Sequence, residues 1–452
     1  MTIVEPGQGT RDLAKKRVRH FLADFNKLES EFPSIYPKMI VRGDGPYVVD
    51  SDGHRILDAG THLGACQVGH SRPEIADRMA EQTRTLEFIA LDGGVSHGYA
   101  AELAERLAPL VQCDDPIFSF TGSGSESNEL AFKIARQYHV RRGAPSRTKI
   151  ISRLGSYHGS TIATSAAAGM AGFKTDFGPM PADFIQAPAP FPGGDVPGRD
   201  RAEWWRQSLA ETQALIEAEG PETIAAIIAE PIAIPQAVKI PTAEYFTGLR
   251  SLCDSFGLLL IIDEVVCGFG RTGRMFGAEH FGVRGDIVSY AKGLTSGYVP
   301  MGAVAVSRQV EEVFAKQPLL HLNTYAGHPV GCAAAMAALD IMEDERLVEN
   351  AATMEGVLKD ELSRLKQAVG RTREISVIGL LSSVVCDISD VADPDAAVRR
   401  VRKNAYDAGV LARIGRDRTN LSAHFYPPLN VTANDVTAGV HALEVGLRSI
   451  DA

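Results

Sequence analysis

Lys292 is the residue whose position most suggests covalent chemistry. It follows the apolar run Ile287–Ala291 and precedes a glycine-rich segment that begins at Gly293. A lysine amine that projects from a strand end into a partly desolvated cleft has a lowered pKa and can attack an aldehyde. Most lysines are merely solvated, so it is the surrounding pattern that makes Lys292 a candidate nucleophile.

Two carboxylates, Asp263 and Glu264, end the apolar run Leu258–Ile262. Ligands of open α/β sheets bind beyond the carboxyl ends of the strands. Successive side chains of a strand point in opposite directions, so one of the two carboxylates should face the ligand. There it could keep a ring nitrogen protonated. The alternative is a helix cap or a salt bridge with Arg271 or Arg274.

Ser123, Gly124 and Ser125 lie between an expected strand and an amphipathic helix. Small residues let backbone N–H groups approach an anion, and a helix N-terminus with nearby hydroxyls can bind a phosphate. A dinucleotide site is less well matched, because Ser127 stands where the third glycine of that fingerprint belongs. A serine-capped turn is the structural alternative.

Tyr157 follows the expected strand Lys149–Arg153, which brings an aromatic ring to the same edge of the sheet. Such a ring could stack on a planar cofactor. A tyrosine packed in the core is the alternative.

The elements that must position these residues alternate between apolar runs and helical patterns, which predicts an α/β fold with a mainly parallel sheet. The expected strands are Pro116–Phe120, Lys149–Arg153, Thr223–Ala229, Leu258–Asp263, Ile287–Ala291 and Ala303–Ser307. Their continuous apolar character is typical of strands buried on both faces. We expect a large domain over residues 76–330 and a small one from residues 1–75 and 331–452, in which Tyr36–Asp58 forms an antiparallel hairpin.

The composition excludes several functional classes. The chain has 452 residues and a net charge of −10, so neither nucleic acid nor an anionic membrane surface is an expected partner. The six cysteines include no C-x-x-C pair, so we expect neither a zinc site nor a disulfide framework. We therefore expect a protein without a bound metal, in a reducing, cytoplasmic location. No apolar run is long enough for a membrane span.

Taken in order, the motifs closely resemble those of the class III aminotransferases, which are pyridoxal-phosphate enzymes of fold type I. The segments that carry the resemblance are Gly69–Glu74, Ser123–Glu129, Tyr157-His158-Gly159, Glu230-Pro231, Asp263-Glu264-Val265, Gly268–Gly273, Ala291-Lys292-Gly293, Thr324-Tyr325, Gly327-His328-Pro329 and Pro427-Pro428-Leu429. The similarity covers nearly the whole chain. It implies a large domain with a mainly parallel sheet flanked by helices and a smaller α+β domain.

The resemblance also implies roles for individual residues. Lys292 is the expected Schiff-base lysine, which forms the aldimine with pyridoxal 5'-phosphate and moves a proton between the substrate and the cofactor. Asp263 is the expected partner of the pyridine nitrogen, and Tyr157 is expected to stack on the ring. The full predicted cofactor site is Ser123, Gly124, Ser125, Tyr157, His158, Glu230, Asp263, Val265, Lys292 and Thr324. Thr324 is expected to come from the neighbouring subunit, which implies a homodimer with shared active sites.

The implied reaction moves an amino group from an amine or ω-amino acid to pyruvate or 2-oxoglutarate by ping-pong kinetics. Arg413 is the expected ligand of the acceptor's carboxylate, with Arg416 as an alternative. Many amine-selective relatives have a tryptophan in the loop where this chain has Leu63–Cys66, which suggests a roomier pocket. A decarboxylase, an epimerase or an aminomutase of the same family is the alternative activity, and a nicotinamide dehydrogenase is the alternative outside it.

Overall fold

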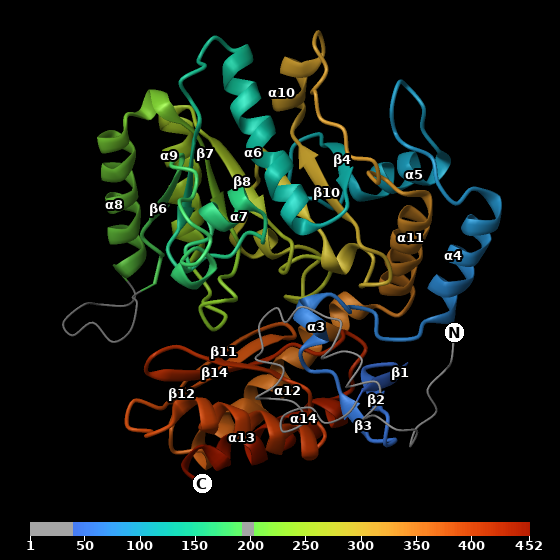
Figure 1. The fold of residues 1–452 in the computed structure, drawn as a ribbon, viewed down its shortest axis with the longest axis vertical. Coiled ribbons are helices and arrows are strands. Elements are labelled where there is room, and N and C mark those ends of the chain that lie inside the picture. The colour runs from blue at the N-terminus through green and yellow to red at the C-terminus, as the bar shows by residue number, and fades with distance from the viewer. Residues whose placement is uncertain (1–38, 192–202) are drawn as a thin grey trace. The chain divides into compact units, whose positions relative to one another are not determined.

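A computed structural model of the chain describes residues 39–191 and 203–452. The described residues form two compact units. The larger unit comprises residues Glu74–Gly270 and Arg274–Asp340, and the smaller unit comprises the described residues up to Pro73, with Arg271–Gly273 and Ile341–Ala452. Figure 1 labels the elements of both units.

The larger unit contains a seven-stranded sheet in the order β4-β10-β9-β8-β7-β5-β6. Its strands are β4 (Ile117–Thr121), β5 (Lys149–Arg153), β6 (Phe184–Ala187), β7 (Ile224–Ala229), β8 (Leu259–Asp263), β9 (Ile287–Tyr290) and β10 (Gly302–Val306). The pairs from β6 across to β9 are parallel, whereas β10 is antiparallel to both β9 and β4. The predicted α/β fold with a mainly parallel sheet is therefore confirmed.

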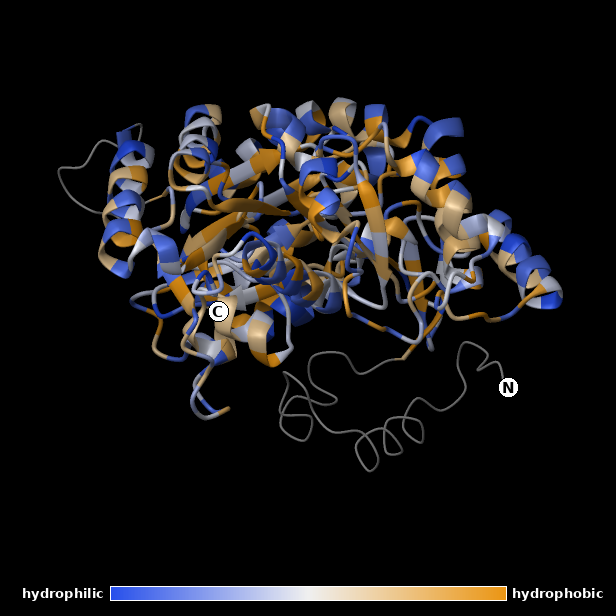
Figure 2. Cartoon of the chain, turned by 90° about the horizontal axis from the view of Figure 1, so that it is seen from above, coloured by the Kyte–Doolittle hydropathy of each residue, from blue (hydrophilic) through white to orange (hydrophobic). Residues whose placement is uncertain are grey.

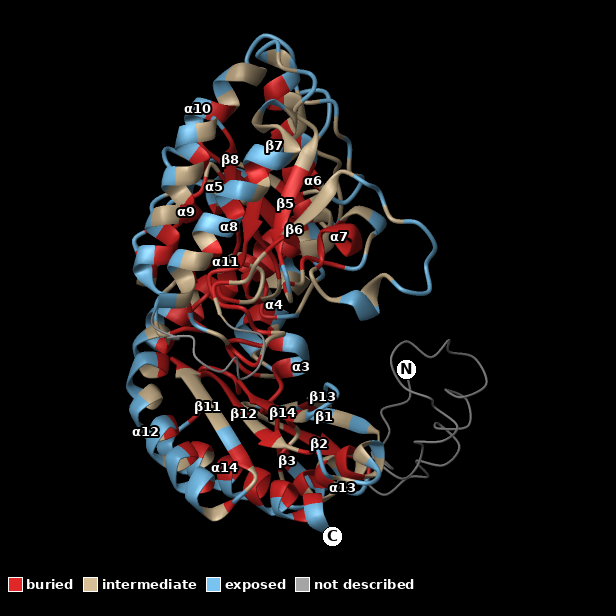
Figure 3. Cartoon of the chain, turned by 90° about the vertical axis from the view of Figure 1, so that its left-hand side faces the viewer, coloured by how far each residue is buried: buried red, intermediate tan, exposed pale blue. Residues whose placement is uncertain are grey.

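The central strands consist of apolar residues that are buried on both faces. Every residue of β7, β8 and β10 is buried, and Figures 2 and 3 show this sheet as an apolar, buried layer. Burial on both faces explains why these strands appear in the sequence as unbroken apolar runs without alternation.

Helices cover both faces of the sheet. Figure 3 shows α6 and α7 on one face and α8 and α9 on the other. The helices of the larger unit are α4 (Pro73–Thr85), α5 (Gly98–Leu107), α6 (Gly124–Arg141), α7 (Ile162–Ala167), α8 (Trp204–Glu219), α9 (Ala243–Phe256), α10 (Arg308–Glu311) and most of α11 (Pro329–Asp344). Short 3₁₀ turns include η4 (Gly277–Phe281) and η5 (Lys292–Leu294).

The smaller unit contains two antiparallel sheets, β1-β2-β3 and β11-β12-β14-β13. Its strands are β1 (Ile40–Asp44), β2 (Tyr47–Asp50), β3 (Arg55–Leu57), β11 (Thr372–Ile378), β12 (Leu381–Asp387), β13 (Arg413–Arg416) and β14 (Asn420–Phe425). Its helices are α3 (Thr61–Gly64), α12 (Leu347–Ala368), α13 (Pro394–Asp407) and α14 (Ala433–Leu447). Helix α14 packs against both α12 and α13. No helix in the described ranges has the length and apolar character that crossing a bilayer requires.

The opening hairpin contains one strand more than expected. The stretch expected as a single strand up to Asp50 is divided, because Gly45 adopts a positive φ of 56° and separates β1 from β2. The antiparallel pairing continues through β3, so the motif is a three-stranded meander. Residues 36–38 of the expected hairpin lie outside the described residues.

Candidate active site

The carboxyl ends of β8 and β9 lie side by side. The two strands are parallel, with Asp263 opposite Ser289, and the Glu264 N–H donates to the Ser289 carbonyl at 3.0 Å. Lys292 follows Ser289 by three residues. Asp263 and Lys292 therefore leave neighbouring strands at the same edge, as the sequence pattern predicts.

Lys292 does not continue the strand. Strand β9 ends at Tyr290, and Lys292 begins the turn η5 with a φ of 45°. A positive φ is unfavourable for a lysine, and such strained residues concentrate at functional sites. The Leu294 N–H donates to the Ala291 carbonyl at 3.0 Å and closes the turn around the lysine.

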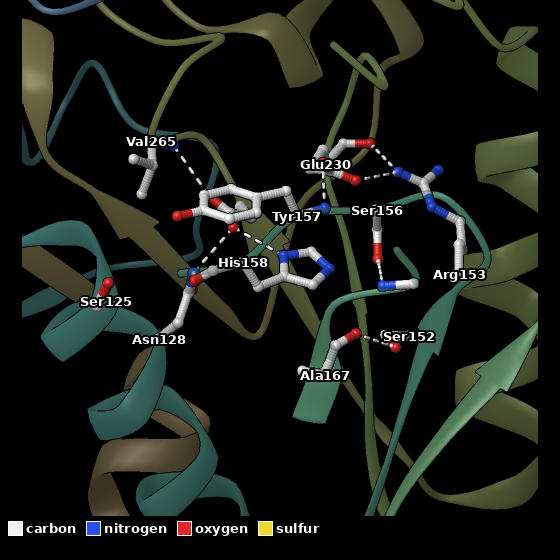
Figure 4. A network of polar contacts seen from close by, with 12 residues as sticks. Ser125, Asn128, Ser152, Arg153, Ser156, Tyr157, His158, Ala167, Glu230 and Val265 are labelled. Carbon is white, nitrogen blue, oxygen red and sulfur yellow. Dashed lines mark hydrogen bonds and ion pairs between the residues drawn. The ribbon is translucent and has the colours of Figure 1, made fainter. Parts of the chain in front are cut away.

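The Asp263 carboxylate is held by three hydrogen bonds. Its Oδ2 accepts from Nδ2 of Asn128 and from Nδ1 of His158, both at 2.8 Å, and its Oδ1 accepts from the Val265 N–H at 3.0 Å. The residue is 4% exposed. Figure 4 shows Asn128, His158 and Val265 gathered in this network. The surrounding elements fix its orientation.

Glu264 points away from Asp263 and caps η4. Its two oxygens accept the N–H groups of Gly277 at 3.0 Å and Ala278 at 2.7 Å. Burial raises the pKa of Glu264 to about 8, against the lowering effect of these hydrogen bonds. The two carboxylates thus point in different directions, as alternation along a strand predicts, and Glu264 has a structural contact.

The expected phosphate turn forms the first residues of α6. Ser123 is the N-cap and accepts the Glu126 N–H at 3.2 Å. The backbone N–H groups of Gly124 and Ser125 lie in the first turn of this 18-residue helix, where the helix dipole favours an anion. The serine cap and a phosphate site are therefore compatible at this turn.

Gly124 is required by close packing at the same edge. A Cβ at this position would lie 2.8 Å from Cγ1 of Val265 and 3.4 Å from Cβ of Ala291. These residues follow β8 and immediately precede Lys292. The absence of a side chain at Gly124 brings the helix N-terminus up to the two strand ends that carry Asp263 and Lys292.

Tyr157 is half-buried and is anchored through its backbone. Its N–H donates to Oε1 of Glu230 at 3.1 Å, and its ring contacts Phe173 with the centroids 4.9 Å apart. Glu230 in turn lies 3.3 Å from Nη2 of the buried Arg153. Burial raises the pKa of Glu230, although the charges of His158 and Arg153 oppose the shift. Figure 4 shows the Tyr157 ring beside His158.

Thr324 and Arg413 are exposed and take no part in the hydrogen-bond network around Asp263. Thr324 is exposed, and its neighbour Asn323 donates to Oε2 of Glu126 at 2.5 Å. Arg413 begins β13 in the smaller unit and is exposed. The alternative residue, Arg416, is engaged by Asp395 at 2.8 Å.

The sequence model of the family "Aminotransferase class-III" matches residues 32–447. The chain belongs to the class III aminotransferases. It is similar to a β-alanine–pyruvate aminotransferase of Pseudomonas aeruginosa, with 34% identity over 92% of both chains. It is similar to an (S)-enantioselective ω-transaminase of Thermomicrobium roseum, with a TM-score of 0.91 and 35% identity over 98% of this chain and 99% of that one. The ω-transaminase of Pseudomonas jessenii in complex with PMP gives a TM-score of 0.90 and 31% identity over 97% and 98% of the chains.

The aminotransferase contains one network residue that sequence reasoning missed. Asn128 is buried and donates both to Asp263 and to the His158 carbonyl, at 2.7 Å. The available signal was a polar residue at the start of a helix, α6, whose buried residues are mostly apolar. Such a residue needs a buried partner.

A surface cavity of about 460 Å³ lies away from this network. Its lining includes Arg250, Asp286 and Ser307, at the start of β9 and the end of β10. These residues lie at the edge of the sheet opposite to Asp263. The cavity contributes none of the aminotransferase's predicted site residues.

Proposed function

We propose that this aminotransferase takes the amino group of an amine or ω-amino acid and delivers it to pyruvate or 2-oxoglutarate, with pyridoxal 5'-phosphate as its cofactor. Because the chain belongs to the class III aminotransferases, it is an enzyme that transfers an amino group to a keto acid. One observation carries the proposal for the site. Asp263 accepts three hydrogen bonds, and it lies at the same edge of the sheet as Lys292 and the N-terminus of α6.

The donor set at this edge fits the cofactor. Pyridoxal phosphate, when bound, supplies a ring that accepts electrons from the substrate's α-carbon. Asp263 would hold the proton on the ring nitrogen, because Asn128 and His158 keep its carboxylate oriented toward one position. Ser123, Gly124 and Ser125 would bind the phosphate at the positive end of α6.

The remaining predicted residues would position the ring and move protons. Tyr157 would pack against one face, with its backbone held by Glu230, and Val265 would contribute apolar contact beside Gly124. Lys292 would carry the cofactor on Nζ and move a proton at the substrate's α-carbon. Its strained turn would restrict where the amine can reach.

We propose a homodimer in which Thr324 completes the partner's phosphate site. Thr324 is exposed in a segment that also exposes Leu320 (86%), Leu322 (70%) and Tyr325 (63%). Three large apolar side chains exposed within six residues of each other are typical of an interface. A second copy of the chain is the occupant that the family resemblance implies.

We further propose that residues 76–330 form the cofactor-binding domain, and that residues 1–75 with 331–452 form the smaller one. Arg413 would bind the acceptor's carboxylate, since Arg416 is already engaged by Asp395. The absence of an aromatic side chain in Leu63–Cys66 favours bulky amine donors. Free thiols at all six cysteines support a reducing, cytoplasmic location.

The experiment that tests the proposal is a panel of amines and ω-amino acids, each paired with pyruvate and with 2-oxoglutarate and scored for keto-acid consumption. We expect parallel double-reciprocal lines for the preferred pair and a visible absorption band that is lost in Lys292→Ala. Release of carbon dioxide in step with turnover, or product formation without a keto acid, would reject the proposal in favour of a decarboxylase or an epimerase.

A further inference from the structure

Cys66 in the smaller unit lies within a cluster of charged side chains that the proposed reaction does not use. The cluster also contains Asp58, His70 and Arg271. His70 Nε2 lies 3.0 Å from Oδ2 of Asp58, and the same imidazole hydrogen-bonds the Cys66 thiol. The arrangement is a carboxylate, an imidazole and a thiol in series, which is the arrangement that activates cysteine nucleophiles.

The imidazole in this series is held in its charged form. Burial opposes protonation of His70, but its hydrogen bonds to Asp58 and Cys66 outweigh burial and raise the pKa of His70 to about 10. Asp58 is 0% exposed, so its negative charge has little solvent to stabilise it and needs a cation beside it. At neutral pH the His70 imidazole is therefore protonated.

Arg271 is a second buried cation in the same cluster. It is 0% exposed, and within the described residues its hydrogen bonds go to neutral oxygens: Leu380 O at 3.1 Å, Pro427 O at 2.5 Å and the side-chain oxygen of Gln67. Burial lowers the pKa of Arg271 to about 10, while the charges of Tyr426, Cys66 and Asp58 act in the opposite direction. The cluster thus contains two cations, His70 and Arg271, and one buried carboxylate.

The backbone before Cys66 is strained. Thr61, His62 and Leu63 have φ values of 37°, 44° and 70°, three successive non-glycine residues in the left-handed region. The Cys66 N–H donates to the Thr61 carbonyl at 3.4 Å, and the Thr61 hydroxyl is fully buried and has no hydrogen-bond partner among the described residues.

The other five cysteines lack such surroundings. Burial raises the pKa of Cys113, Cys253 and Cys332 to about 12, raises that of Cys386 to about 11, and raises that of Cys267 well above its usual value. These thiols stay protonated at neutral pH and are poor nucleophiles. The reactivity of Cys66 toward an oxidant can therefore be compared with that of the other five cysteines in the same protein.

We propose that Cys66, His70 and Asp58 form a peroxide-reactive thiol site. The Cys66 sulfur, as the thiolate, attacks one oxygen of hydrogen peroxide, the S–O bond forms and the O–O bond breaks. The sulfur is oxidised by two electrons to a sulfenic acid, and the peroxide is reduced. The departing hydroxide takes the imidazolium proton of His70 and leaves as water. Peroxide is small enough to approach a thiol that is 6% exposed, beside the exposed side chains of His62 and Leu63.

The test treats the full-length, cofactor-loaded enzyme with hydrogen peroxide and dimedone, and locates the adduct by peptide mass spectrometry. We expect dimedone at Cys66, with at least roughly tenfold less at the other five cysteines. Cys66→Ser should abolish the labelling, whereas Cys386→Ser, at a buried cysteine outside the cluster, should leave it unchanged. Labelling spread evenly over the cysteines, or absent from Cys66, would overturn the proposal.

The dependence on His70 needs two measurements. His70→Gln should slow the oxidation of Cys66 roughly tenfold or more, with the melting temperature recorded to show that the variant is folded. Oxidation of Cys66 in His70→Gln at the same rate as in the unmodified enzyme would contradict the activation.

Discussion

The imidazole of His158 and the carboxylate of Asp263 are joined by a 2.8 Å hydrogen bond between residues 105 positions apart in the chain. Both side chains are buried, with side-chain exposures of 0% and 5%. His158 reaches this position from the loop after β5, whereas Asp263 ends β8. The bond therefore links two strand ends across the intervening β7 and fixes the carboxylate at the centre of the proposed site.

Asp263→Asn should lower kcat by roughly 100-fold or more, because a neutral amide cannot hold the ring nitrogen protonated. Asn128→Ala should have a smaller effect, roughly tenfold, because it removes one of three hydrogen bonds that orient the carboxylate and leaves its charge intact. Single-turnover kinetics with a fixed amine donor measure both effects. Equal losses in the two variants would contradict the distinction between charge and orientation.

Gly124→Ala should weaken cofactor binding, because its new Cβ would lie 2.8 Å from Val265 Cγ1. Val265→Ala in the same chain should restore part of the affinity by removing the atom that clashes. Gly356→Ala is the matched control: Gly356 lies in α12 with no atom within 4 Å of a new Cβ, and the change should add about 0.5–1 kcal/mol of stability. Cofactor titration followed by absorbance measures the affinity, and failure of Val265→Ala to help would show that packing is not the cause.

Arg413→Ala should raise KM for the keto acid by roughly tenfold or more while KM for an amine donor without a carboxylate changes little, because only the acceptor presents a group that a guanidinium recognises. Arg416→Ala is the control, since its ion pair with Asp395 is solvent-exposed and distinct from the proposed role. Steady-state kinetics with both substrates varied decide the assignment. If Arg416→Ala instead raises KM for the keto acid alone, Arg416 and not Arg413 binds the acceptor's carboxylate.

The fold should lose stability as the pH falls from 7 to 5, in part through His424. Burial, with the nearby charge of Arg413, lowers the pKa of His424 to about 4. Below pH 6.5 the unfolded chain binds a proton there and the folded chain does not, so unfolding becomes easier by about 2 kcal/mol at pH 5. His424→Leu should lose correspondingly less between pH 7 and 5 in urea unfolding. An identical pH dependence in the two proteins would exclude His424 as a contributor.

Leu322→Asp should shift the enzyme toward monomers, because it places a charge in the exposed apolar segment around Thr324. Phe177→Asp, another exposed apolar side chain in a different segment, is the control and should leave the assembly unchanged. Sedimentation velocity measures the assembly state. If the unmodified enzyme sediments as a monomer, the proposal of an active site shared between subunits is wrong. The assignment of the cofactor site at Asp263 is tested separately, by the visible absorbance.

Hydrophobic pattern predicted the strands of the larger unit to within about one residue at most ends. Strand Lys149–Arg153 was predicted with its observed bounds, because a strand buried on both faces must be apolar along its length. Strand β11 escaped prediction, since most of its residues are only partly buried and its pattern is not distinctive. Strand β6 was missed for the same reason.

The sequence by itself determined the kind of chemistry, because Lys292, Asp263 and the Ser123–Ser125 turn each follow a strand, and parallel strands present their carboxyl ends at one edge. Only the tertiary structure decided which side chains hold Asp263 in place and which thiol lies beside a charged imidazole. Asn128 lies 135 positions from Asp263, and Arg271 is brought to the Cys66 cluster from far along the chain. Hydrogen bonds and buried charges act over a few ångströms, so they depend on which distant residues the fold brings together. The local sequence pattern around a residue does not indicate which distant residues these are.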